Sequence, residues 1–416
     1  MHVEEGRFSV WRPVISIPAA QGRLPGPAVT AALGIAQILA WGTSFYFPAV
    51  FSGPIAADTG WSLGMVVSGA TVGLLTAAIV SPQIGSLIDR RGARPVILAS
   101  PLLYTAGLCG IGLSSVPAIY FASWIVLGLG MGTGLYDAVF AALGHLYGRE
   151  ARTPITNLTL FGGFASTVCW PLSAFMIEHV GWRNACFIYA ALHLFLSLPL
   201  QAAVLPRRKL ELAAETNEFE ARSVSPRQNE AAVFTLLALV MSLTAGIGSI
   251  VVVHLLIFLQ ARGVDYAAAV ALGTLFGPAQ VAARLGERIF GSRYHPIWTL
   301  VASCALMVVG LLLLSAQFKV LFVIVILYGA GYGVSWIARG TLPLALFGPI
   351  RFPRLMGKLA FPSLVVQALA PSAGALLVEQ SGVETTLITL TMLAALNLLL
   401  VLLLWAIRRR QIATAT

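Results

Sequence analysis

The chain is a succession of long apolar runs separated by short polar gaps. The runs fall at about 28–50, 63–84, 96–113, 118–143, 154–176 and 184–205, and then at about 231–258, 267–285, 297–314, 319–347, 359–378 and 384–407. Each run is close to the roughly 20 apolar residues that a helix needs to cross a bilayer. A membrane barrel would instead show short segments of alternating hydrophobicity. The pattern therefore predicts an all-α integral membrane protein with twelve transmembrane helices.

The polar gaps divide the chain into parts. We expect an N-terminal tail (1–27), a first six-helix bundle (28–205), a linker (206–230), a second six-helix bundle (231–407) and a C-terminal tail (408–416). Nearly all of the 26 Lys and Arg fall in the tails, the linker and the gaps on the same side, whereas the opposite loops carry only Arg183, Arg262 and Lys319. Because basic loops stay in the cytoplasm, this split predicts a multi-pass protein of the plasma (inner) membrane with both termini and the linker cytoplasmic.

Composition and charge exclude several other classes of protein. Hydrophobic residues make up 58% of the chain and charged residues 10%, whereas soluble domains have about 25% charged residues. The net charge of +10 is spread over the gaps, so it predicts topology and no nucleic-acid partner. The four cysteines lie singly within apolar runs, which gives no reason to expect a disulfide or a metal site. We expect the lipid bilayer and a small molecule as partners of a monomer, without metal or cofactor.

The two halves repeat each other at an offset of 201 residues, as from Gly128 to Gly329. The correspondences are Gly128, Gly130 and Gly132 with Gly329, Gly331 and Gly333; Gly85 with Gly286; Pro95 with Pro296; and Glu178 and Gly181 with Glu379 and Gly382. The glycine triplets occupy equivalent helices and the other matches keep the same register. Parallel repeats of six spans are typical of one class of secondary transporters.

The gap between the second and third predicted helices carries a motif, Gly85-Ser-Leu-Ile-Asp-Arg-Arg-Gly-Ala-Arg94. The glycines Gly85 and Gly92 allow a tight reversal, and Arg90, Arg91 and Arg94 hold the loop in the cytoplasm. Asp89 is an anion that a helix N-terminus would stabilise. We expect it near Gly357 and Lys358, at the start of the eleventh helix, where it would support a closed cytoplasmic side.

This motif closely resembles the signature of the major facilitator superfamily, except that Ala93 replaces a usual basic residue. The resemblance implies the fold of that superfamily, two pseudo-symmetric six-helix bundles, and gating roles for Gly85, Asp89, Arg90, Gly92 and Arg94. Gly181-Trp182-Arg183 is a further feature of the superfamily. Pro54-Ile55 and Gly60-Trp61-Ser62 resemble, over a short stretch, the monocarboxylate and oxalate/formate branch.

The same resemblance implies that helices 1, 4, 7 and 10 line a central cavity. The candidate substrate-binding residues on these helices are Gln37, Trp41, Tyr136, His254, Tyr328, Tyr332, Trp336 and Arg339. The aromatic residues of helix 10 equally fit a packing stripe, and His254 equally fits a packed, hydrogen-bonded side chain.

Two charged residues, Asp137 and Arg339, are expected well inside spans, at similar depth in opposite halves. Intramembrane charges usually face a cavity or a partner. We expect them to pair when the cytoplasmic side is closed and to part when it opens, which makes both of them gating residues. The alternative is that each side chain snorkels to the headgroups.

The most concrete hypothesis is a secondary transporter of a small organic anion, such as a carboxylate, that works by alternating access. Arg339 would bind the anion, and a proton or a counter-anion would be coupled to transport. Export of apolar or cationic compounds, with Asp137 as the anionic partner, is the alternative within transport. A transport-like sensor or a membrane enzyme is the alternative from another class, but the chain lacks clustered catalytic residues and a long soluble segment, so we expect no catalytic residue.

Overall fold

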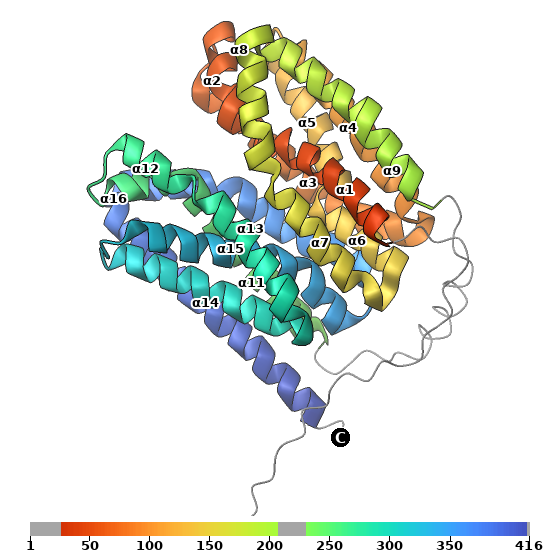
Figure 1. Ribbon diagram of the computed structural model, residues 1–416, viewed down its shortest axis with the longest axis vertical. Coiled ribbons are helices and arrows are strands. Elements are labelled where there is room, and N and C mark those ends of the chain that lie inside the picture. Colours follow the sequence, from red (N-terminus) through yellow and green to blue (C-terminus); the bar gives the residue numbers. More distant parts are fainter. Residues whose placement is uncertain (1–25, 207–229, 414–416) are drawn as a thin grey trace, which may run out of the picture.

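The computed structural model describes residues 26–206 and 230–413, and the elements in these ranges are helices (Figure 1). The first half contains α1 (Gly26–Gly42), α2 (Phe47–Thr59), α3 (Leu63–Arg91), α4 (Ala93–Gly112), α5 (Pro117–Gly134), α6 (Tyr136–Tyr147), α7 (Arg152–Gly163), α8 (Ala165–Leu192) and α9 (Leu198–Val204). The second half contains α11 (Glu230–Gln260), α12 (Tyr266–Gly273), α13 (Phe276–Phe290), α14 (Pro296–Ser315), α15 (Leu321–Phe347) and α16 (Phe352–Ala413). Short 3-10 helices cover Gly148–Ala151 and Gly291–Arg293, and a π-helix covers His193–Ser197.

The described helices form nine stretches that are long and apolar enough to cross a membrane, and two of these fold back on themselves. The stretch Pro117–Val204 turns near Gly148 and again at Gly181, so it contains three spans. The stretch Phe352–Arg409 turns at Gly382 and contains two. The described chain therefore crosses twelve times, which confirms the predicted fold class.

Packing across the two fold-backs proves the reversals. Ser173 and Tyr189 are hydrogen-bonded at 2.7 Å between their hydroxyl oxygens, although 16 residues of straight helix would separate them by about 24 Å. Leu359 and Leu404 likewise pack in one hydrophobic cluster. The turning residues Gly181 and Gly382 have φ of 79° and 78°, a conformation that favours glycine. They are also the pair that the repeat matches, so the internal symmetry extends to the turns.

Several helix ends differ from the apolar runs. The first span continues past residue 50 to Thr59 and is broken between α1 and α2, and α16 begins at Phe352 and continues to Ala413. Hydropathy marks the hydrocarbon core, whereas a helix continues into the interface as long as its backbone stays bonded. The predicted N-terminal tail and linker lie, but for their edge residues, outside the described residues, and the domain boundaries stay a prediction.

The two ends of the molecule differ in how the halves meet. We call the end at which α9 stops and α11 starts the linker end, and the end with the Gly181 and Gly382 turns the distal end. Toward the linker end, α3 and α6 pack against α16, and α7 packs against α13 and α15. In Figure 1 the two halves diverge from there toward α2 and α12. The molecule is therefore joined at its linker end.

At the distal end, each half carries a three-helix clasp built around an arginine. In the first half, Arg183 pairs with Asp58 and donates to the carbonyl oxygen of Ser114 at 3.4 Å. In the second half, Arg262 pairs with Glu384 and donates through Nε to the carbonyl oxygen of Leu314 at 2.8 Å. Each clasp ties the first, third and sixth spans of its own half.

Candidate functional site

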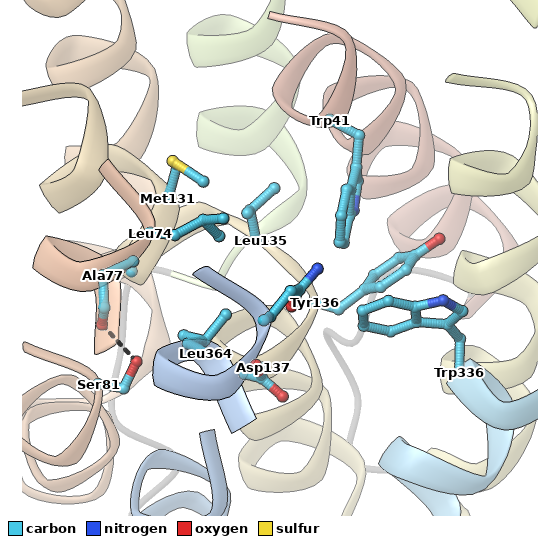
Figure 2. A pocket seen from close by; sticks show the side chains of 12 residues that line it. Trp41, Leu74, Ala77, Ser81, Met131, Leu135, Tyr136, Asp137, Trp336 and Leu364 are labelled. Carbon is cyan, nitrogen blue, oxygen red and sulfur yellow. Dashed lines mark hydrogen bonds between the residues drawn. The ribbon is translucent and has the colours of Figure 1, made fainter. Parts of the chain in front are cut away.

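A pocket lies between the halves, on the linker side of the break between α1 and α2. It is lined from the first half by Trp41, Leu74, Ala77, Ser81, Met131, Gly132, Leu135, Tyr136 and Asp137, and from the second half by Trp336, Leu364 and Gln367. Figure 2 shows apolar side chains of α3 and α5 on one side and three aromatic rings on the other. The pocket is thus mainly apolar, with one carboxylate at its border.

The three rings form an aromatic cluster made of Trp41, Tyr136 and Trp336 (Figure 2). Their centroids are 4.9 Å apart for Trp41 and Tyr136, 5.3 Å for Trp41 and Trp336, and 5.5 Å for Tyr136 and Trp336. Gln37 holds the cluster in place, because it accepts from Trp41 Nε1 at 3.1 Å and donates to the carbonyl oxygen of Gly134 at 2.5 Å. The cluster joins α1 and α6 to α15 and therefore bridges the two halves.

Asp137 and Arg339 form a bidentate ion pair between the halves. Arg339 Nε donates to Asp137 Oδ1 at 2.7 Å and Nη2 donates to Oδ2 at 2.9 Å. The side chain of Arg339 retains 8% of its accessible surface and that of Asp137 retains 16%, so the snorkelling alternative is wrong. The predicted contact between the two side chains is present, whereas its loss in an open state and the gating role of the pair stay predictions. Both carboxylate oxygens are engaged in this state.

Arg284 of α13 is a buried guanidinium, although the charged residues that follow it in the sequence are typical of a loop. It is 2% exposed, so the expectation of only two intramembrane charges was wrong. Its Nε donates to the carbonyl oxygen of Gly333 at 2.9 Å, Nη1 to that of Thr159 at 2.5 Å, and Nη2 to Gln280 Oε1 at 3.1 Å. All three acceptors are neutral. The sequence held a signal for this, since Arg284 lies inside the apolar run 267–285, one residue before its end.

Arg284 is linked to the aromatic cluster through one acceptor. The carbonyl oxygen of Thr159 accepts both from Arg284 and, at 3.4 Å, from the Tyr136 hydroxyl. Gly162 and Gly163 make this approach possible, because a Cβ at Gly162 would lie 2.0 Å from the Tyr136 hydroxyl and one at Gly163 would lie 2.6 Å from Arg284 Nη1. The site therefore combines an aromatic wall, an ion pair that is neutral as a unit, and a guanidinium that has no carboxylate among its hydrogen-bond acceptors.

The other candidate residues lie at different distances from the pocket. Tyr332 is next to the cluster, 6.1 Å from Trp336 between ring centroids. Tyr328 is buried further away, with its hydroxyl 3.4 Å from the carbonyl oxygen of Ile247, and His254 bonds the carbonyl oxygen of Ile250 on its own helix. Neither of these two lines the pocket, and their roles stay predictions.

The pocket walls also differ from the expected set of helices 1, 4, 7 and 10. The seventh span, α11, is separated from the pocket by α16, where Gln367 lines the pocket and its carbonyl oxygen accepts from Ser249 at 3.0 Å. The second span, α3, and the eleventh span, in α16, take part instead. These are the helices that meet where the halves join at the linker end.

The loop that carries the motif from Gly85 to Arg94 lies at this junction. Asp89 forms an ion pair with Arg354 Nε at 2.6 Å, near the start of α16 as expected but with a side chain in place of the backbone near Gly357. Gly85 packs directly on α16, because a Cβ there would lie 2.4 Å from the carbonyl oxygen of Pro353 and 3.1 Å from Gly357 Cα. The gating role of these residues stays a proposal.

The rest of this loop supports the first half alone. Gly92 ends α3 with φ of 85°, and Arg94 Nη1 donates to the carbonyl oxygen of Ala202 at 2.8 Å, while Arg90 is exposed.

Comparison with known proteins gives a family and a set of relatives. A family model described as Major Facilitator Superfamily matches residues 33–297. Monocarboxylate transporter 3 of Rattus norvegicus is 27% identical over 340 residues, which cover 77% of this chain and 66% of that protein. Monocarboxylate transporter 11 of Mus musculus is 34% identical over 155 residues, which cover 36% of this chain and 32% of that protein. The matches thus span slightly less than two thirds of the length of the first relative and about one third of the second.

Solved structures share the fold at low sequence identity. The human organic anion transporter MFSD10 (TETRAN) has a TM-score of 0.71 at 16% identity and covers 91% of this chain and 100% of its own. The proton:xylose symporter XylE has a TM-score of 0.70 at 13% identity, covering 90% of this chain and 94% of its own.

Proposed function

The chain belongs to the Major Facilitator Superfamily, and on that premise we propose that it is a secondary transporter of small organic anions with a carboxylate group. One observation carries the proposal: Arg284 is a buried guanidinium whose three hydrogen-bond acceptors are all neutral. Burial of a charge is costly unless an opposite charge compensates it. A carboxylate is the ligand that a planar guanidinium binds best, through two parallel hydrogen bonds.

The surroundings of Arg284 fit a short carboxylate with an apolar body. The Tyr136 hydroxyl lies beside the guanidinium at their shared acceptor, Thr159, and could donate to the same carboxylate. The cluster of Trp41, Tyr136 and Trp336 offers an apolar wall for the body of the substrate. The names of the curated relatives, which are monocarboxylate transporters, support the same substrate class.

The contacts that join the halves at the linker end support alternating access as the mechanism. Opening that end would separate Arg284 on α13 from the Thr159 carbonyl oxygen on α7, and Arg339 from Asp137. The freed donors would then be available to an anion. A substrate that binds the separated donors better than the joined ones shifts the equilibrium between the two states. Anion binding at Arg339 remains a proposal for that open state.

The test is transport by the purified protein in proteoliposomes with a panel of radiolabelled short monocarboxylates. Arg284→Lys keeps the charge but loses the planar fork, so we expect uptake to fall by about tenfold or more. Arg288→Gln, on an exposed position one turn further along α13, is the matched control and should transport normally. If Arg284→Lys and the parent took up carboxylates equally well, or if only cationic amphiphiles were transported, the proposal would fail.

A further inference from the structure

The described residues carry one positive charge too many at the candidate site. Asp137 is the acidic residue that lines the pocket, and both of its oxygens are bound by Arg339. This pair is neutral as a unit. The guanidinium of Arg284 therefore adds a net charge of one to a site that water hardly reaches, since its exposure is 2%.

The elements packed around α13 do not compensate this charge. On α13 itself, Glu287 accepts from the Thr299 hydroxyl at 2.8 Å and lies 3.7 Å from Arg152 of α7, so its charge is already balanced. The charged residue of α15 that faces the site is Arg339, and it is paired with Asp137. Apart from the Asp137–Arg339 pair, the titratable groups near Arg284 on these and the neighbouring segments are the phenols Tyr46, Tyr136 and Tyr332. A phenol is neutral near pH 7.

We infer that the chain exchanges one organic anion for another and does not couple transport to a proton. The inference rests on the proposed function, because it takes the bound anion to sit on Arg284. A loaded site is neutral, since one carboxylate balances one guanidinium. An empty site keeps an unbalanced charge while it is closed off from water. The loaded carrier therefore changes state faster than the empty one, and an anion on the far side accelerates uptake.

Gln280 is the residue that sets this coupling. Its Oε1 accepts from Arg284 Nη2 at 3.1 Å, and it is 7% exposed. A glutamate at this position has nearly the same shape and would place a carboxylate on the guanidinium. The empty site would then be neutral, and the substrate anion would bind only after a proton had neutralised that carboxylate. Gln280→Glu should therefore convert an anion exchanger into a carrier that takes up anion and proton together.

The experiment compares two modes of uptake in proteoliposomes of the full chain, with a radiolabelled short monocarboxylate as the probe. One set of vesicles contains unlabelled carboxylate, and the other is empty with an inward proton gradient. We expect internal carboxylate to accelerate uptake by the parent protein severalfold and the proton gradient to change it hardly at all. We expect Gln280→Glu to show the reverse. Gln280→Ala removes the acceptor without adding an acid, so the proton gradient should not drive uptake by this variant.

The possible results distinguish failure of the anion-exchange inference from failure of the proposed function. Fast uptake by the parent into empty vesicles, driven by the proton gradient and insensitive to internal carboxylate, would overturn the inference and leave the proposed function standing. A Gln280→Glu protein that melts like the parent but keeps pure exchange would also overturn it. No carboxylate uptake in either mode by a parent protein that melts cooperatively would instead overturn the proposed function.

Discussion

Asp137 and Arg339 lie 202 residues apart in the chain, yet their side chains meet across the interface of the halves. Such a pair costs desolvation energy for both charges, which its two hydrogen bonds offset. Removing one partner leaves the other charge buried alone. The pair therefore contributes little net free energy to folding, but the joined state requires both charges to be present.

A double-mutant cycle tests this coupling. Asp137→Ala and Arg339→Ala should each destabilise the joined state by about 3–5 kcal/mol, and the double variant should lose clearly less than the sum of the two. Thermal unfolding in detergent and initial transport rates measure the effect. Glu230→Ala and Arg351→Ala form the control cycle, because Arg351 is 54% exposed and such pairs couple by less than about 1 kcal/mol. Additive losses at Asp137 and Arg339 would mean that the two charges act separately.

His295 makes stability depend on pH. It lies between α13 and α14, where its Nδ1 accepts from the backbone N–H of Ile297 at 3.2 Å and caps α14. Burial, together with Arg408 and Arg152, lowers the pKa of His295 to about 4, below the usual value of about 6.5. As the pH falls, His295 is protonated in the unfolded chain at a higher pH than in the folded protein. The free energy of unfolding therefore decreases as the pH drops from about 6.5 to 4.

His295→Asn should flatten this dependence, since asparagine is also a good cap but does not titrate. Melting temperatures of both proteins, measured from pH 7.5 to pH 4.5, give the comparison. The melting temperature of the parent should fall more than that of the variant between pH 6.5 and 4.5. If the melting temperatures of both proteins changed equally with pH, His295 would not be the cause.

At the residue scale, the sequence predicted the Asp137–Arg339 pair but missed Arg284. The pair was predictable because charges inside long apolar runs are rare and the repeat places both at similar depth. Arg284 was missed because it lies near the end of a run, among Glu287, Arg288 and other charges typical of a loop. Only the packing of α13 against α7 and α15 decides that this arginine points inward.

At the scale of elements, the close approach of α3 and α16 depends on two glycines. A Cβ at Gly85 would lie 2.4 Å from the carbonyl oxygen of Pro353, and one at Gly357 would lie 2.3 Å from that of Ser81. The backbones can meet here because both positions lack a side chain. The sequence indicated a special role for Gly85 through its motif and placed this loop near Gly357, but it did not show that the backbones touch at these two glycines.

Gly85→Ala should open the linker end, because overpacking of this kind costs about 1–3 kcal/mol and only the joined state bears the cost. Spin labels on Glu150→Cys and Arg293→Cys, in a Cys109→Ser background, report the distance between the halves there. Gly286→Ala is the matched control: it is the repeat equivalent of Gly85 and has no atom within 4 Å of its new Cβ. A Gly85→Ala distance distribution identical to that of Gly286→Ala would contradict this role.

Helix number and order followed from the apolar runs, whereas the breaks within spans did not. The interruption between α1 and α2 and the π-helix at His193–Ser197 lie inside continuous apolar sequence. They arise from tertiary contacts, such as the bond of 2.9 Å between the Thr43 hydroxyl and His193 Nε2. Hydropathy does not record such contacts.

At the scale of the whole molecule, the orientation in the membrane stays a prediction. We expect the linker end to face the cytoplasm, because the basic residues gather there. Arg91→Cys at the linker end and Glu178→Cys at the distal end, each in a Cys109→Ser background, are both exposed. A membrane-impermeant thiol reagent should label Glu178→Cys in intact cells and Arg91→Cys only after permeabilisation. The opposite labelling would reverse the orientation and with it the direction of the proposed cycle.

The two distal clasps have a consequence for the history of the chain. Arg183 and Glu384 occupy equivalent positions of the repeat, so the clasps match in place but have exchanged their charges: the acid lies on the first span in one half and the base on the seventh span in the other. Two identical halves facing each other across a twofold axis would bring like charges together whenever their distal ends approached. In this chain the acid of the first clasp is Asp58 on the first span and the acid of the second is Glu384 on the twelfth, so the two clasps are not copies of each other. Exchanging one half for the other would therefore reverse the sign of the charge at these positions, so the halves are not interchangeable.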